Sequence, residues 1–163
     1  MKRDQMIEEI RKKKECHLVE IVEDLVSRAV TKDENISWRC LEKEVVELKE
    51  KGISTMVYSY YFVTNRNFVR IFASENEYWY KLCPLNRFMG LEENNLPEER
   101  PIDHMDYFVK AGFPGELKVK IYFDVADEGL RQVQLESKGV NEKKEIKKLI
   151  STLMTAVSAL DKE

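Results

Sequence analysis

Residues 56–82, MVYSYYFVTNRNFVRIFASENEYWYKL, contain most of the aromatic residues of the chain and repeat with a period of two. Successive side chains of a β-strand point to opposite faces, so the alternation predicts strands over residues 56–63, 68–73 and 77–82. Polar residues at 64–67 and 74–76 separate them, and asparagine tolerates the backbone angles of tight turns. We therefore expect a three-stranded antiparallel meander.

Large apolar side chains occupy both faces of this meander. Fully buried arginine is rare, so we place the face of Arg70 outward and Val69 with Ile71 inward. An outer face rich in aromatic residues needs further cover from another segment or another chain. The pattern predicts an interaction surface made of Tyr58, Tyr60, Phe62, Phe68, Arg70 and Phe72.

Before the meander, the spacing of apolar residues favours helices. Three-to-four spacing over residues 4–30 predicts one long amphipathic helix, so we assign residues 1–30 to an N-terminal helix. Residues 1–14 carry few apolar side chains and are expected to be dispensable for folding of the rest. Ser37 is a suitable N-cap, apolar residues follow at 38, 41, 45 and 48, and Gly52 is a suitable stop. These features predict a second helix over residues 38–52.

After the meander, residues 83–116 contain all four prolines of the chain and predict a long Pro-rich excursion. A short helix is expected within it over residues 102–110. Residues 117–125 alternate strictly and predict a strand that forms a hairpin with residues 131–136. Asn141 then caps a C-terminal helix with an apolar stripe up to Leu160.

The predicted order of elements is α-α-β-β-β-short α-β-β-α. Consecutive hairpins make a sheet mainly antiparallel, which predicts an α+β fold. We expect two layers, with about five strands in the sheet and the helices packed on one face. A chain of 163 residues is long enough for one core, so residues 1–163 are expected to form a single domain.

Composition excludes several classes of protein. With 43% hydrophobic and 35% charged residues, the chain is expected to be globular and not disordered. No apolar run approaches the roughly 18 residues of a membrane span. The first residues lack the apolar segment of a secretory signal, so we expect an intracellular location, without distinguishing cytoplasm from nucleus. The net charge of −3 argues against general binding to nucleic acid or anionic membranes.

The usual signatures of catalysis are missing from the sequence. The glycines are scattered and form no phosphate-binding loop. The two histidines, His17 and His104, have no local nucleophile signature beside them. We expect no catalytic residues and no cofactor.

Metal and disulfide chemistry is not expected either. Cys16, Cys40 and Cys83 are odd in number and widely spaced, which suits neither a disulfide framework nor a zinc site. Asp103 and Asp106 flank His104, but two carboxylates on one helix face make a weak metal site. We interpret these residues as structural.

Three functions remain open. The first is a non-catalytic protein–protein interaction or assembly module that self-associates or belongs to a larger complex. The second is a regulator or inhibitor that binds nucleic acid through the 56–82 hairpin, or mimics it through the acidic segment Glu92–Glu99. Its binding cations would be Arg66, Arg70, Lys81 and Arg87. The third is a small-ligand domain or enzyme that uses Tyr122, His104 and Arg131.

Overall fold

The structure is a computed structural model that describes residues 1–48, 52–96, 116–125, 129–137 and 140–160. Its helices and antiparallel strands confirm the α+β class. The elements fall into two compact units, Met1–Asn86 with Thr152–Glu163, and Arg87–Ser151. The assignment of the whole chain to a single domain stays a prediction.

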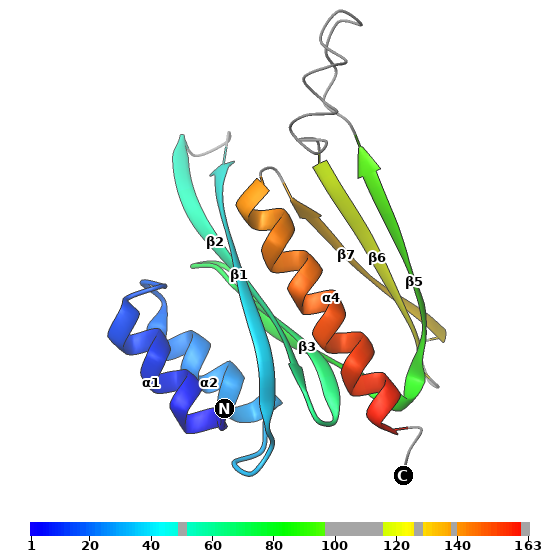
Figure 1. Ribbon diagram of the computed structural model, residues 1–163. Helices are drawn as coiled ribbons and strands as arrows, with labels where there is room; N and C mark the ends of the chain where they lie inside the picture. The colour runs from blue at the N-terminus through cyan, green and yellow to red at the C-terminus, as the bar shows by residue number, and fades with distance from the viewer. Residues whose placement is uncertain (49–51, 97–115, 126–128, 138–139, 161–163) are drawn as a thin grey trace, which may run out of the picture. The chain divides into compact units, whose positions relative to one another are not determined.

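Each unit contains one antiparallel sheet (Figure 1). The sheet of the first unit has the strand order β1-β2-β3-β4, and that of the second unit has the order β5-β6-β7. The strands are β1 (Ile36–Leu48), β2 (Ile53–Thr64), β3 (Asn67–Ala73), β4 (Tyr78–Pro84), β5 (Phe88–Leu96), β6 (Glu116–Val125) and β7 (Gly129–Ser137). The helices are α1 (Arg3–Lys13), α2 (Val19–Ala29), the short 3-10 helix η1 (Leu85–Arg87) and α4 (Val140–Leu160).

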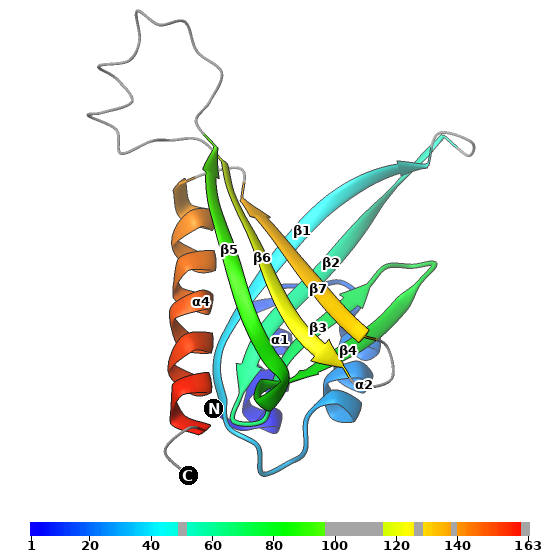
Figure 2. The ribbon, with the colours of Figure 1, turned by 90° about the vertical axis from the view of Figure 1, so that its right-hand side faces the viewer.

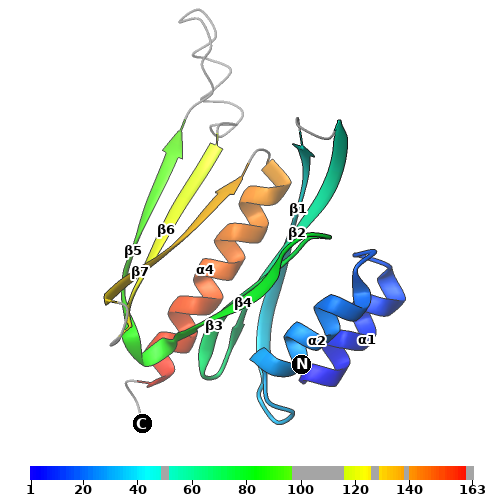
Figure 3. The ribbon, with the colours of Figure 1, turned by 180° about the vertical axis from the view of Figure 1, so that it is seen from behind.

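Helices α1 and α2 cover one face of the first sheet, as Figures 1 and 3 show from opposite sides. Met6 and Ile10 of α1 are fully buried, and so are Val22 and Val26 of α2. These helices pack against side chains of β2 and β3, namely Tyr58, Tyr60, Phe62, Val69 and Ile71. The predicted packing of helices on one sheet face is thus found in this unit. Met6 and Ile10 thus dock the segment 1–14 on its own sheet, and that this segment is dispensable for folding stays a prediction.

The predicted helix over residues 4–30 is two helices. The break begins at Lys14, which has a left-handed φ of 50°. The linker that follows, residues 15–17, turns toward the sheet, and Cys16 is buried in the core. Side chains of consecutive helical residues point about 100° apart, so an unbroken helix would not bring the whole linker to the sheet.

The predicted helix over residues 38–52 is strand β1. Its apolar spacing fits a helix, but β2 pairs with β1 along its whole length, from Ile36 opposite Thr64 to Leu48 opposite Ile53. Pairing with a neighbouring strand overrides local helix preference. Gly52 has a φ of 62° and lies in the turn that leads into β2, so it does not end a helix.

In the second unit, the predicted strand from residue 117 and its hairpin partner are present as β6 and β7. Leu117, Val119, Ile121 and Phe123 are fully buried, as their alternation predicted. Part of the predicted excursion is the strand β5, which pairs with β6. The described residues therefore form seven strands in two sheets, where about five in one sheet were predicted. The short helix predicted over residues 102–110 lies outside the described residues.

The C-terminal helix α4 agrees with its predicted apolar stripe, but it begins at Val140, so the prediction of Asn141 as its N-cap is wrong. Ile146, Leu149, Ile150 and Leu153 are buried at the expected 3–4 spacing. Its residues up to Ser151 belong to the second unit, and its residues from Thr152 belong to the first. None of the helices in the described ranges combines the length and the apolar character needed to cross a membrane.

Candidate interaction surface

The six predicted surface residues divide between the two faces of the first sheet. The register of β2 and β3 sets Tyr60 opposite Ile71 and Phe62 opposite Val69. The aromatic residues Tyr58, Tyr60 and Phe62 therefore lie on the helix-covered face, in the core. This differs from the predicted single outer face, because a shift of one residue in register moves every side chain of a strand to the other face.

Phe68, Arg70 and Phe72 lie on the opposite face, which we call the outer face. Their neighbours Val69 and Ile71 point to the helices, so the predicted orientation of β3 is confirmed. Phe68 is fully buried, whereas Arg70 and Phe72 are half-buried. Only the last two can offer part of their surface to a ligand.

Arg70 and Phe72 belong to a group of polar and aromatic side chains on the outer face of β2, β3 and β4. Arg70 lies between Tyr61 and Lys81 in one row across the three strands, and Phe72 lies opposite Trp79 in the next row. Exposure increases from the buried Tyr61 on β2 to the exposed Lys81 on β4. We call this group the outer patch, and its members are Tyr61, Arg70, Phe72, Trp79 and Lys81.

The rings and cations of the outer patch are in direct contact. The guanidinium carbon of Arg70 lies 5.4 Å from the ring centre of Tyr61 and 5.1 Å from that of Trp79. The Nζ atom of Lys81 lies 4.9 Å from the same Trp79 ring. Phe72 stacks on Trp79, with 5.1 Å between ring centres and 7° between ring planes. Cations at these distances are attracted to the faces of aromatic rings.

Arg70 is held by rings and not by an anion. In the part of the chain that the structure describes, no carboxylate forms an ion pair with Arg70. Its Nε atom is buried and has no hydrogen-bond partner. A guanidinium carries five N–H donors in a planar fork that matches a carboxylate or a phosphate. The two rings therefore hold Arg70 in place, and its Nε donor remains without an acceptor. This makes Arg70 the centre of the candidate surface.

Tyr61 supports Arg70 as a neutral phenol. Burial raises the pKa of Tyr61, and the nearby Glu42 carboxylate raises it further. The Tyr61 hydroxyl donates to a carboxylate oxygen of Glu42 at 3.5 Å. The ring beneath the guanidinium thus stays uncharged and fixed in place.

A second polar cluster attaches the α1–α2 linker to the sheet. Two nitrogens of Arg39 on β1 donate to the two carboxylate oxygens of Glu15, each at 2.7 Å. Arg39 also donates to Glu9 of α1 at 3.3 Å, and the Tyr60 hydroxyl donates to Glu15 at 3.3 Å. Burial raises the pKa of Tyr60, so its phenol keeps the proton that it donates. The cluster connects α1, the linker and both strands of the β1–β2 hairpin.

The other linker residues have equally specific partners. The Nδ1 atom of His17 lies 2.6 Å from the hydroxyl of Tyr58, and its Nε2 atom lies 3.6 Å from Glu75. Burial raises the pKa of the Cys16 thiol, whereas a cysteine nucleophile needs a lowered one. We therefore assign the linker residues a structural role.

The residues of the nucleic-acid hypothesis are only partly brought together. Arg70 and Lys81 are neighbours, and Arg66 lies exposed in the turn between β2 and β3. Arg87 belongs to the second unit. On β5, Glu92 lies opposite Lys120 and Asn94 opposite Lys118, so the described part of the acidic segment pairs with the lysines of β6. Residues 97–99 of that segment lie outside the described residues.

Of the residues of the small-ligand hypothesis, Tyr122 and Arg131 are not brought together. Arg131 pairs with the buried Phe123, whereas Tyr122 pairs with Gln132 on the other face of the sheet. His104, with Asp103 and Asp106, lies outside the described residues. Within the described ranges, no three side chains of histidine, cysteine, aspartate or glutamate are grouped to hold a metal ion.

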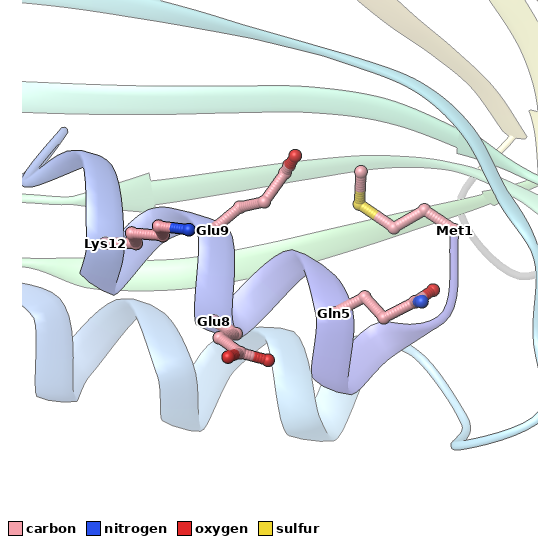
Figure 4. Close-up of a pocket in the computed structure, with 5 residues that line it drawn as sticks. All are labelled: Met1, Gln5, Glu8, Glu9 and Lys12. Carbon is pink, nitrogen blue, oxygen red and sulfur yellow. The ribbon is translucent and has the colours of Figure 1, made fainter.

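An open depression of about 370 Å³ lies along α1 (Figure 4). It is lined by Met1, Gln5, Glu8, Glu9 and Lys12, all of which come from the first residues and one side of the helix. Glu8 and Lys12 are exposed, and Glu9 is already paired with Arg39. We interpret this depression as a solvated helix surface.

Tyr61 and Trp79 were missing from the predicted surface. The signal that identifies them is the length of the two hairpin turns. The turn at Asn65–Arg66 leaves two residues between the paired ends, which sets Tyr61 opposite Arg70. The turn at Glu75–Asn76 similarly sets Phe72 opposite Trp79.

Comparisons of the chain were made with protein-family models, with curated proteins and with solved structures, and none of the three finds a match.

Proposed function

We propose that this chain is a non-catalytic protein–protein interaction or assembly module that binds its partner through the outer patch. The observation that supports this most directly is that Arg70 lies between the rings of Tyr61 and Trp79 while its Nε donor has no acceptor. Tryptophan, tyrosine and arginine are the residues that most often dominate binding energy in protein interfaces. The patch combines all three on rigid strands.

The chemistry of the patch favours an acidic partner surface. Arg70 and Lys81 supply two positive charges, and a carboxylate that reaches Arg70 would receive charge-assisted hydrogen bonds. The rings of Phe72 and Trp79 beside them offer apolar contact area. A glutamate or aspartate side chain flanked by apolar residues matches this arrangement.

Nucleic acid fits the same patch less well. Base recognition on a sheet needs an open aromatic face on which a base can stack. The Trp79 ring already has Phe72 stacked on it and both cations over it. The net charge of −3 also opposes a phosphate backbone.

The patch is tested by binding a fluorescein-labelled hexaglutamate peptide and following its anisotropy. We expect saturable binding to the wild-type chain, and binding about tenfold weaker or more for Arg70→Gln, since a hydrogen bond to a charged group contributes about 1.5–3 kcal/mol. Arg66→Gln removes one exposed positive charge outside the patch and is the matched control. It should change the affinity only slightly at physiological salt.

Two further probes separate the alternatives. A hexaglutamine peptide should not bind, because the carboxylates are the recognised groups. Equal affinities of wild type and Arg70→Gln for hexaglutamate would contradict the proposal. Tighter binding of a labelled oligothymidylate than of hexaglutamate would favour the nucleic-acid hypothesis instead.

A further inference from the structure

The accessible part of the outer patch has two rows. Arg70 on β3 lies opposite Lys81 on β4, and Phe72 on β3 lies opposite Trp79 on β4, where the two strands run side by side (Figure 2). The first row carries the two cations, and the second row carries the two rings. Lys81 is exposed, and the other three side chains are half-buried. A partner can therefore contact one charged row and one aromatic row.

Strand geometry fixes the distance between these rows. Arg70 and Phe72 are two residues apart on one strand, and a strand rises about 3.3 Å per residue, so the rows lie about 6.6 Å apart. A partner segment in the extended conformation has the same rise, so its residues i and i+2 can lie over the two rows. A helical partner would instead present residues i and i+3 or i+4 on one face.

The borders of the two rows favour the extended conformation. On β2, the neighbours of these rows are Ser59 and Tyr61, and both are buried, so the accessible strip is confined to β3 and β4. Beyond the charged row, Phe68 and Cys83 form the next row, and both are fully buried. Neighbouring strands lie about 4.8 Å apart, whereas a helix with its side chains is about 10–12 Å across. An extended segment is narrower and fits this strip better than a helix does.

Each row is suited to a different kind of side chain. The Nε donor of Arg70 has no acceptor within the described residues, and Lys81 adds a second positive charge, so a carboxylate is stabilised over the charged row. The rings of Phe72 and Trp79 stack with 5.1 Å between their centres and stay partly exposed. A carboxylate over this row would lose water without gaining a donor, whereas a large apolar side chain would bury apolar area there.

We propose that the partner presents an extended segment in which an acidic residue and a large apolar residue are two positions apart. The acidic side chain lies over Arg70 and Lys81, and the apolar side chain lies over Phe72 and Trp79. The main chain of the segment lies above the side chains of the sheet and forms no ladder with a strand, so either chain direction meets both rows. This inference rests on the proposed function and adds the conformation and the spacing of the recognised residues.

Two fluorescein-labelled octapeptides of identical composition test the spacing on the full chain. In the first, the sequence glutamate-serine-leucine-serine occurs twice in succession, which sets glutamate and leucine on the same face of an extended segment. In the second, glutamate-leucine-serine-serine occurs twice in succession, which sets them on opposite faces. We expect anisotropy to show that the first peptide binds about tenfold more tightly, because partial burial of a leucine side chain changes an affinity by about that factor.

A helical partner would reverse the order of the two affinities. The second peptide has a leucine and a glutamate three residues apart, which makes them neighbours on a helix, whereas the first has them two or six apart. Equal affinities of wild type for the two peptides, or tighter binding of the second, would overturn the inference.

Phe72→Ala tests whether the aromatic row contacts the leucine. The variant should bind the first peptide hardly more tightly than the second, and its affinity for hexaglutamate should be nearly unchanged because the charged row is intact. Arg66→Gln, outside the patch, should keep the wild-type preference for the first peptide. A full preference for the first peptide in Phe72→Ala would contradict the assignment of the leucine to this row. The two-peptide comparison on wild type needs no variant and decides the spacing even where Phe72→Ala is unstable.

The inference and the proposed function can fail separately. If Arg70→Gln weakens hexaglutamate binding while wild type binds the two octapeptides equally, the proposed function holds and the spacing is wrong. If hexaglutamate binding does not depend on Arg70, the proposed function fails and the spacing fails with it.

Discussion

Phe62→Ala is expected to lower the free energy of unfolding by about 3–5 kcal/mol, the usual cost of emptying a buried phenylalanine site. Phe62 is 0% exposed and belongs to the core between the sheet and helices α1 and α2. Phe72→Ala makes the same change on the outer face, where the side chain is only half-buried. Phe72→Ala is expected to lower the free energy of unfolding by about 1 kcal/mol.

Urea denaturation followed by circular dichroism measures both variants, and the pair of identical substitutions controls for the change in residue type. If the register of β2 and β3 is as described, Phe62→Ala must lower the free energy of unfolding more than Phe72→Ala. A larger loss for Phe72→Ala would contradict that register and return the β2 aromatic residues to the outer face.

Arg39→Met is expected to lower the free energy of unfolding by about 3 kcal/mol, because it leaves the Glu15 carboxylate buried without its cation. The side chains of Arg39 and Glu15 are only 13% and 16% exposed, so solvent cannot replace the lost partner well. The double variant Arg39→Met, Glu15→Gln removes both charges and should recover much of the loss. A double variant as unstable as the single one would show that the packing of the arginine matters more than its charge.

The same pair predicts how stability depends on pH. Burial opposes ionisation of Glu15, but the hydrogen bonds and charge of Arg39, with the Tyr60 hydroxyl, outweigh burial, and the pKa of Glu15 is lowered from its ordinary value. A carboxyl with a lowered pKa in the folded state stabilises the protein above its ordinary pKa and loses that contribution as pH falls through the lowered value. Wild type should thus lose stability in the acidic range, and this loss should be smaller in Arg39→Met. Parallel pH profiles of melting temperature for the two proteins would contradict this assignment.

Much of the fold follows from local pattern. The strict alternation of residues 117–125 and the stripe of α4 each fit one kind of element only, and both are present as predicted. Residues 36–48 are compatible with two kinds of element. Their apolar residues at 38, 41, 45 and 48 suit a helix, but the segment as a whole can also pair as a strand. The long partner strand β2 decides between them, and a partner distant in sequence is not part of a local pattern.

The candidate surface was predicted less completely than the fold. The sequence identifies Arg70 and Phe72 as outward-facing residues, and their outward orientation is found. Which β2 and β4 side chains accompany them depends on register, which the two-residue turns determine and the alternation does not. The break at Lys14 is likewise a consequence of the partners of residues 15–17 on the sheet.

The burial of α1 and α2 under the first sheet has a consequence for the order of events during synthesis. Met6 and Ile10 have their core partners as far along the chain as Ile71, so the two helices leave the ribosome long before the sheet that covers them exists. At about 5–20 residues per second, their apolar stripes stay uncovered for some seconds. The apolar stripes of the nascent N-terminal segment are therefore covered only after the β2–β3 hairpin has emerged.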